Sequence, residues 1–163
     1  RVYAEDPANG FVPSVGVLQL VQEPQAPGVR VDSGVVSGDQ ISLHYDPLLA
    51  KLSVLGMDRN DAIAKMALAL QDYVILGDVV TNLPFLRTLC AHPAFGAGDT
   101  TTAFIEQYLA GWQEEMPPPS EPVLIAAALA ELLERSAQPS TQGAPDSPDP
   151  YNPWQQLTGF RLG

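Results

Sequence analysis

The side chains best suited to chemistry in this sequence lie in the stretch Val29-Arg-Val-Asp-Ser-Gly34. Arg30 places a guanidinium between two valines, directly before an Asp-Ser-Gly turn. A guanidinium stays protonated at any working pH and offers forked N–H donors, so its chemistry would be to bind or stabilise an anion. From composition alone, however, an arginine on a strand is usually a surface residue paired with a neighbouring carboxylate, here Asp32. The residues by themselves leave both interpretations open.

The other reactive side chains lack the spacing of a metal or nucleophile site. His44 and His92 are far apart, and neither has a cysteine or second histidine at ligand spacing. We therefore expect both histidines to be structural and predict no metal site. Cys90 lies on the apolar face of a predicted helix without a nearby cation, which is typical of a small buried hydrophobic residue.

The composition excludes several classes of function. The 163 residues suffice for one compact domain, or for one small domain with an appendage. A net charge of −11 with only 8 Lys and Arg argues against nucleic-acid binding. No apolar run reaches the roughly 18 to 20 residues of a membrane span, and residues 1–20 lack the order of a signal peptide. We therefore expect a soluble, cytoplasmic protein without membrane or nucleic-acid partners.

The elements that must position Arg30 are predicted from the hydrophobic periodicity. Short alternating or β-branched runs, separated by Gly and Pro turns, predict strands in the first part of the chain. These strands, which we expect to form one antiparallel sheet, cover residues 15–21, 29–36, 40–45 and 51–55. A further strand is predicted at 73–76.

Three helices are predicted, the first before the strand at 73–76 and the other two after it. Asp58 is a plausible N-cap for the first, with Asp61 in the first turn where the helix dipole favours an anion. The second is capped by Thr81 or Asn82 and ends before His92. The third covers about residues 102–110. Together with the strands, they predict an α+β fold in which helices pack on an antiparallel sheet.

A change in amino-acid composition near residue 112 divides the chain into three predicted segments. Residues 1–111 form the predicted domain, and residues 112–136 form a connecting segment with an apolar helix from about 121 to 135. At roughly 15 residues, this helix is too short to span a bilayer, so we expect it to pack against the domain or a neighbouring chain. Residues 137–163 begin as a Pro/Ser-rich linker, because residues 117–153 hold nine of the sixteen prolines.

The run Gly96-Ala-Gly-Asp99 is similar to the anion-hole turn of ribokinase-type sugar kinases. In those enzymes, backbone N–H groups at a helix N-terminus hold a phosphate and the aspartate acts as a base. None of the other motifs of these kinases is present, and a loop that ends in a helix cap accounts for the same residues. A fragment of a small-molecule kinase is therefore the weakest alternative.

The domain of residues 1–111 resembles the C-terminal subdomain of biotin carboxylase over about residues 1–108. The resemblance is spread over many positions in order, which makes it more specific than any one motif. The matching stretches are Tyr3-Ala-Glu-Asp-Pro7, Phe11-Val-Pro13, Val29-Arg-Val-Asp-Ser-Gly34, Gly38-Asp39, His44-Tyr-Asp-Pro-Leu-Leu-Ala-Lys51, Arg59, Thr81-Asn-Leu-Pro-Phe-Leu-Arg87, His92-Pro-Ala-Phe95 and Phe104-Ile105.

The resemblance implies a role for two arginines. Arg30 would face the ureido ring of biotin and stabilise the biotin enolate during an ATP- and bicarbonate-dependent carboxylation. Arg59 falls in a region that forms the dimer contact in some relatives. One departure is Asp78, which stands where the family has glycine, although Gly77 beside it can serve the turn.

The resemblance also implies what this sequence lacks. It contains no glycine-rich lid, phosphate-binding lysine, Mg²⁺ carboxylate pair or catalytic glutamate, which the family carries in its ATP-grasp portion. We expect that portion to lie before Arg1 and the chain to be an excised fragment that is inactive alone. ATP and Mg²⁺ would bind the upstream domain, so no ATP-binding residue is predicted here.

The end of the sequence indicates which carboxylase. Pro153-Trp154-Gln-Gln-Leu-Thr-Gly159-Phe-Arg161-Leu162 resembles the opening of the middle domain in three-part acyl-CoA carboxylase α subunits. This favours a methylcrotonyl- or propionyl-CoA type α chain, with a biotin carrier domain, a carboxyl transferase subunit and homo-oligomerisation, in the mitochondrial matrix if eukaryotic. The alternative from another class is a non-catalytic interaction module that docks through its apolar helix and Trp154 segment.

Overall fold

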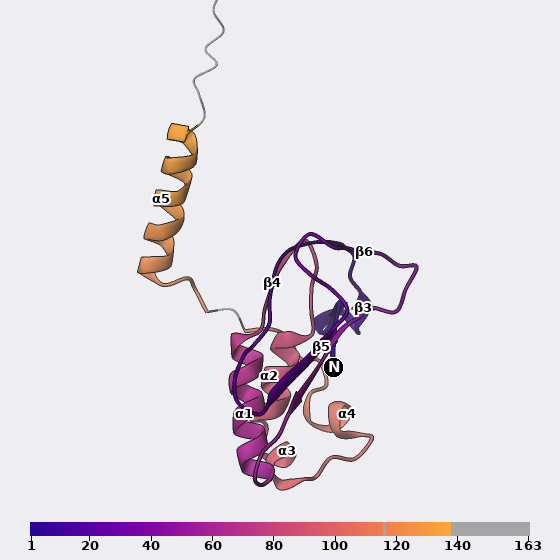
Figure 1. The fold of residues 1–163 in the computed structure, drawn as a ribbon. Helices are drawn as coiled ribbons and strands as arrows, with labels where there is room; N and C mark the ends of the chain where they lie inside the picture. Colours follow the sequence, from indigo (N-terminus) through magenta and orange to yellow (C-terminus); the bar gives the residue numbers. More distant parts are fainter. Residues whose placement is uncertain (116, 138–163) are drawn as a thin grey trace, which may run out of the picture. The chain divides into compact units, whose positions relative to one another are not determined.

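The computed structural model describes residues 1–115 and 117–137, and the chain divides into two compact units, residues 1–116 and 117–163. The first unit is an α+β fold of antiparallel strands and packed helices, which confirms the predicted fold class (Figure 1). The second unit contains helix α5 (Glu121–Ala137), where the apolar stripe predicts a helix. Most of the predicted linker lies outside the described residues. None of the described helices is long and apolar enough to cross a membrane.

The sheet that carries Arg30 has three antiparallel strands in the order β1-β7-β5. Its strands are β1 (Val2–Tyr3), β7 (Leu48–Val54) and β5 (Val29–Ser33). The whole length of β5 pairs with β7, from Val29 opposite Val54 to Ser33 opposite Ala50. Because side chains alternate between the faces of a strand, the valines of β5 lie against the core while the residues between them face away from it.

A second sheet contains β4 (Gly16–Gln22) between β6 (Gln40–Ile41) and β8 (Val74–Gly77). A separate two-stranded ribbon joins β2 (Glu5–Asp6) to β3 (Val12–Pro13). The prediction of one sheet from the first four strands is therefore wrong, because β4 and β5 belong to different sheets. The connection between them, residues 23–28, contains two prolines, which lack the N–H that a continued ladder would use. The strand predicted at 40–45 also shrinks to two residues.

Gly77, directly before Asp78, shapes the backbone where β8 approaches β4. Gly77 adopts φ +150°, and a Cβ atom there would collide with the backbone oxygen of Val17 on β4. The Asp78 N–H donates to that same oxygen at 3.1 Å. The close approach of β8 to β4 thus depends on Gly77, as the sequence suggested.

The described part of the first unit also contains a short 3₁₀ helix, η1 (Pro7–Asn9), and four α-helices: α1 (Arg59–Asp72), α2 (Leu83–Ala91), α3 (Pro93–Ala97) and α4 (Phe104–Tyr108). In Figure 1, α1 and α2 lie beside each other along the sheet that carries β5. Helix α3 was not predicted from the sequence. The helix predicted over 102–110 is present as the shorter α4. The main core beneath α1 and α2 consists of Val2, Ala50, Leu52, Ala69, Leu70, Tyr73 and Leu83.

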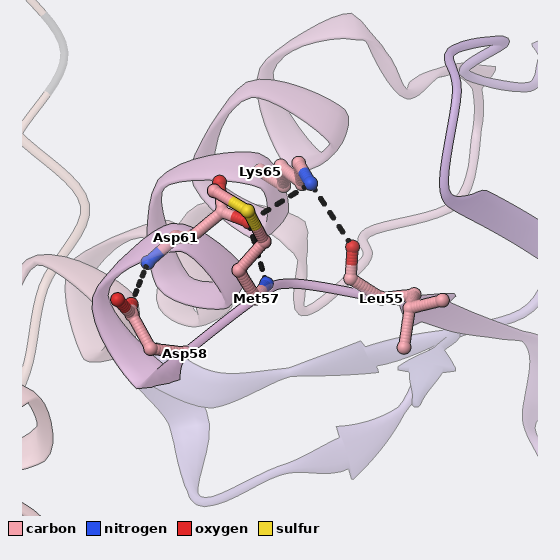
Figure 2. A network of polar contacts seen from close by, with 5 residues as sticks. All are labelled: Leu55, Met57, Asp58, Asp61 and Lys65. Atoms are coloured by element: carbon pink, nitrogen blue, oxygen red, sulfur yellow. Dashed lines mark hydrogen bonds and ion pairs between the residues drawn. The ribbon is translucent and has the colours of Figure 1, made fainter.

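The start of α1 is tied to the end of β7 by a polar network (Figure 2). Asp58 caps the helix as predicted, because its Oδ1 accepts from the Asp61 N–H at 2.9 Å. The Asp61 carboxylate accepts from the Met57 N–H at 2.7 Å and from Lys65 Nζ at 2.9 Å. Lys65 Nζ also donates to the Leu55 oxygen at 3.1 Å. The bond from Met57, followed by that from Lys65, lowers the pKa of Asp61.

Asn82 precedes α2 but does not cap it with its side chain. Instead, its Oδ1 accepts from the Tyr3 N–H at 2.9 Å, and its Nδ2 donates to the Arg1 oxygen at 3.2 Å. Asn82 is a polar residue, yet it is buried, with only 6% of its surface exposed. It therefore completes the hydrogen bonding of β1, which lies about eighty residues away in sequence.

Candidate functional site

Arg30 lies on the solvent-facing side of β5, and its side chain is 76% exposed. Its Nε donates to Asp32 Oδ1 at 2.9 Å, and its Nη2 lies 2.8 Å from the same oxygen. Residues two apart on a strand share a face, so the alternation of β5 brings these two side chains together. The surface ion pair that composition favours is therefore present.

The ion pair leaves part of the guanidinium available. Asp32 Oδ1 accepts from Nε and lies beside Nη2, while the outer edge between Nη1 and Nη2 makes no hydrogen bond with Asp32 and offers a two-donor fork. Such a fork matches a carboxylate, a phosphate or a developing oxyanion. The arrangement can thus hold a structural pair and an anionic ligand at the same time.

Lys51 adds a second cation to this face. It lies on β7 directly opposite Asp32, and its Nζ is 4.0 Å from Asp32 Oδ2. Neither Lys51, which lies in a matching motif, nor Asp32, the expected surface partner of Arg30, was predicted as a site residue. The spacing of Arg30 and Asp32 could have indicated a shared face, whereas the position of Lys51 depends on a strand register that no local pattern specifies.

The histidines and the cysteine lie apart from this face. His44 is exposed in a loop. The His92 ring packs 4.8 Å from Tyr108 and 5.5 Å from Phe104, and its Nδ1 accepts from the Ala94 N–H. Cys90 borders an apolar cavity of about 500 Å³, and burial raises the pKa of its thiol. Among the described residues no cluster of three His, Cys, Asp or Glu side chains could hold a metal ion.

Arg59 joins two helices of the same unit. From the first turn of α1, its Nη2 donates to the Phe95 oxygen at 2.5 Å and its Nε to the Gly96 oxygen at 3.2 Å. Its guanidinium also lies 5.2 Å from the centre of the Phe95 ring. These contacts give Arg59 a role within the fold, and its predicted dimer contact stays a prediction.

The Gly96–Asp99 run does not form an anion-binding turn. Gly96 lies within α3, and Gly98 ends that helix in the left-handed conformation at φ +86°. Asp99 Oδ2 accepts from the Tyr108 hydroxyl at 3.0 Å. The run thus terminates one helix instead of presenting N–H groups at the start of another, which removes the geometric basis of the kinase alternative.

Comparison with known proteins gives consistent results. The family model described as biotin carboxylase C-terminal domain matches residues 1–107. The α subunit of mitochondrial methylcrotonoyl-CoA carboxylase from Dictyostelium discoideum is 37% identical over 99% of this chain and 22% of its own. The α chain of human mitochondrial propionyl-CoA carboxylase is 44% identical over 82% of this chain and 18% of its own. The chain thus spans about a fifth of the length of the curated relatives it matches.

Solved structures share the fold. The biotin carboxylase domain of Hydrogenobacter thermophilus 2-oxoglutarate carboxylase is 34% identical with a TM-score of 0.68, covering 71% of this chain and 25% of its own. Rhizobium etli pyruvate carboxylase is 33% identical with a TM-score of 0.71, covering 81% of this chain and 13% of its own. With the matching motifs around Arg30 on the predicted strand, these findings establish that the chain belongs to the biotin carboxylase C-terminal domain family.

Proposed function

We propose that this chain is the C-terminal part of the biotin carboxylase component of a biotin-dependent acyl-CoA carboxylase. The whole component would use ATP and bicarbonate to carboxylate a ureido nitrogen of biotin. The observation that carries the proposal is the exposed Arg30, whose outer N–H fork has no hydrogen-bond partner among the described residues of a chain of this family. The 2-oxoglutarate carboxylase relative was solved in complex with MgADP and bicarbonate, which supports the same reactants here.

The N–H donors of Arg30 are suited to the carbonyl oxygen of the biotin ureido ring. The ureido group offers one carbonyl oxygen, and the outer fork of Arg30 offers two N–H donors at an exposed surface. Biotin supplies the nitrogen that becomes carboxylated. As negative charge develops on the ureido oxygen, the permanently protonated guanidinium would stabilise it as an oxyanion hole does. Lys51 would add positive potential nearby.

The remaining parts of the proposal follow from the relatives. ATP and Mg²⁺ would bind an ATP-grasp domain, and a biotin carrier domain and a carboxyl transferase subunit would be partners. Residues 1–111 would form the domain, residues 112–136 the connecting segment with the apolar helix, and residues 137–163 a Pro/Ser-rich linker and the start of the next domain. Arg59 would lie near a homodimer contact, since the 2-oxoglutarate carboxylase relative was solved as a domain dimer. The protein would act in the cytoplasm or, in a eukaryote, in the mitochondrial matrix.

Replacement of Arg30 in the full-length protein tests the proposal. Arg30→Ala should lower biotin-dependent ATP hydrolysis by about 10² to 10³, the usual effect of losing one oxyanion donor. Arg30→Lys should retain the charge but lose the fork, and should fall between wild type and Arg30→Ala. Because the side chain is 76% exposed, neither variant should change the melting temperature. Wild-type turnover by Arg30→Ala would contradict the proposal.

A further inference from the structure

We propose that Asp32 is a positioning residue, which holds the Arg30 guanidinium by its inner edge so that the outer fork is directed toward the anion. The proposal rests on the function assigned to Arg30 above. One oxygen, Asp32 Oδ1, accepts from Nε at 2.9 Å and lies 2.8 Å from Nη2. This contact fixes the guanidinium plane from the Nε side and leaves Nη1 and the outer hydrogen of Nη2 directed away from Asp32.

The second carboxylate oxygen has its own neighbour. Asp32 Oδ2 lies 4.0 Å from Lys51 Nζ across the β5–β7 ladder. One carboxylate thus stands between two cations, and the three side chains together carry one net positive charge. The Asp32 carboxylate offsets the repulsion between the two cations, so both can lie close together. The result is a locally positive site on a chain whose net charge is −11.

The ion pair contributes little to folding. Its side chains are 76% and 40% exposed, and pairs this exposed are typically almost neutral for stability. Arginine has one of the largest side-chain conformational entropies. If Asp32 orders the Arg30 side chain before the ligand binds, binding has to offset a smaller entropy loss. The effect of Asp32 should therefore appear in catalysis and be absent from the melting temperature.

The test uses the full-length protein with free biotin as the probe substrate. Asp32→Asn should lower biotin-dependent ATP hydrolysis by about 3- to 10-fold, comparable to immobilising one long side chain. The loss should fall on kcat more than on the KM for biotin, because the charge on the ureido oxygen develops in the transition state. Asp32→Glu should restore part of the rate, since it retains the carboxylate. Asp72→Asn removes an exposed charge at the end of α1 and is the matched control.

A double-mutant cycle separates this inference from the proposed function. If Asp32 acts through Arg30, Asp32→Asn should have no further effect in an Arg30→Ala background. An equal loss in both backgrounds would overturn the inference while leaving the role of Arg30 intact. A lowered melting temperature of Asp32→Asn would also overturn it, because the pair would then be structural. An Arg30→Ala protein with full activity would instead refute the proposed function itself.

Discussion

Replacing Tyr73 by phenylalanine should stabilise this domain, which is the reverse of the usual effect of a core substitution. Tyr73 is 1% exposed and belongs to the core beneath α1 and α2. Within the described residues, its hydroxyl has no hydrogen-bond partner. Ser33 lies close enough to act on the phenol, but its hydroxyl donates to the Val35 oxygen and does not meet hydrogen-bond geometry with Tyr73. Tyr73 therefore buries a polar group without compensation.

The magnitude follows from that unpaired hydroxyl. Leaving a buried polar group unsatisfied costs about 1–3 kcal/mol, so removing it should recover about 1 kcal/mol after the loss of its packing contacts. In a domain of this size, that gain would raise the melting temperature by about 4 °C. Tyr45→Phe, at a side chain that is 84% exposed, is the matched control and should change stability by less than about 0.5 kcal/mol.

Urea unfolding of the 163-residue chain, followed by circular dichroism, measures both variants. The same unfolding experiment is repeated as a function of pH. Burial, with a smaller contribution from the Glu23 carboxylate, raises the pKa of Tyr73. A raised pKa favours the neutral phenol in the folded state, so this contribution is complete below the ordinary tyrosine pKa of about 10 and is lost as pH rises through the folded value. Tyr73→Phe should remove that alkaline loss. Destabilisation by Tyr73→Phe would show that the hydroxyl has a partner, and would refute the reasoning.

Two further predictions concern the scaffold around the site. Gly77→Ala should unfold or severely destabilise the domain in thermal melts, because its Cβ would meet the Val17 oxygen, whereas Gly96→Ala, with open space and helical backbone, should be tolerated. Asp61→Asn should lower stability at neutral pH by removing the anion that pairs with Lys65. Since the pKa of Asp61 is lowered, its contribution is present above the ordinary aspartate range and lost as pH falls through the folded value. Unfolding curves of wild type and Asp61→Asn should therefore converge in acid, and a constant gap would contradict this account.

The local features of the fold were predictable from the sequence, because local rules determine them. Asp58 caps α1 as the pattern predicts, since its side chain reaches an N–H three residues away. The alternation of Val29 and Val31 predicts β5 for the same reason. The pairing of strands was not predictable, because it joins residues far apart along the chain. The consecutive strands β4 and β5 therefore belong to different sheets. Asn82 has a residue type that favours helix capping, but its side chain instead hydrogen-bonds to β1.

The two interpretations of Arg30 that the sequence left open are compatible once the geometry is known. Composition favoured a surface pair with Asp32, and the resemblance favoured an anion-stabilising residue. The pair exists, but it involves the Nε side of the guanidinium, and the outer fork has no hydrogen-bond partner within the part of the chain that the structure describes. Because a pair this exposed contributes little to stability, holding the guanidinium in place is the effect that remains for Asp32. If the proposed role of Arg30 is correct, this exposed ion pair would position the guanidinium for the biotin ureido group.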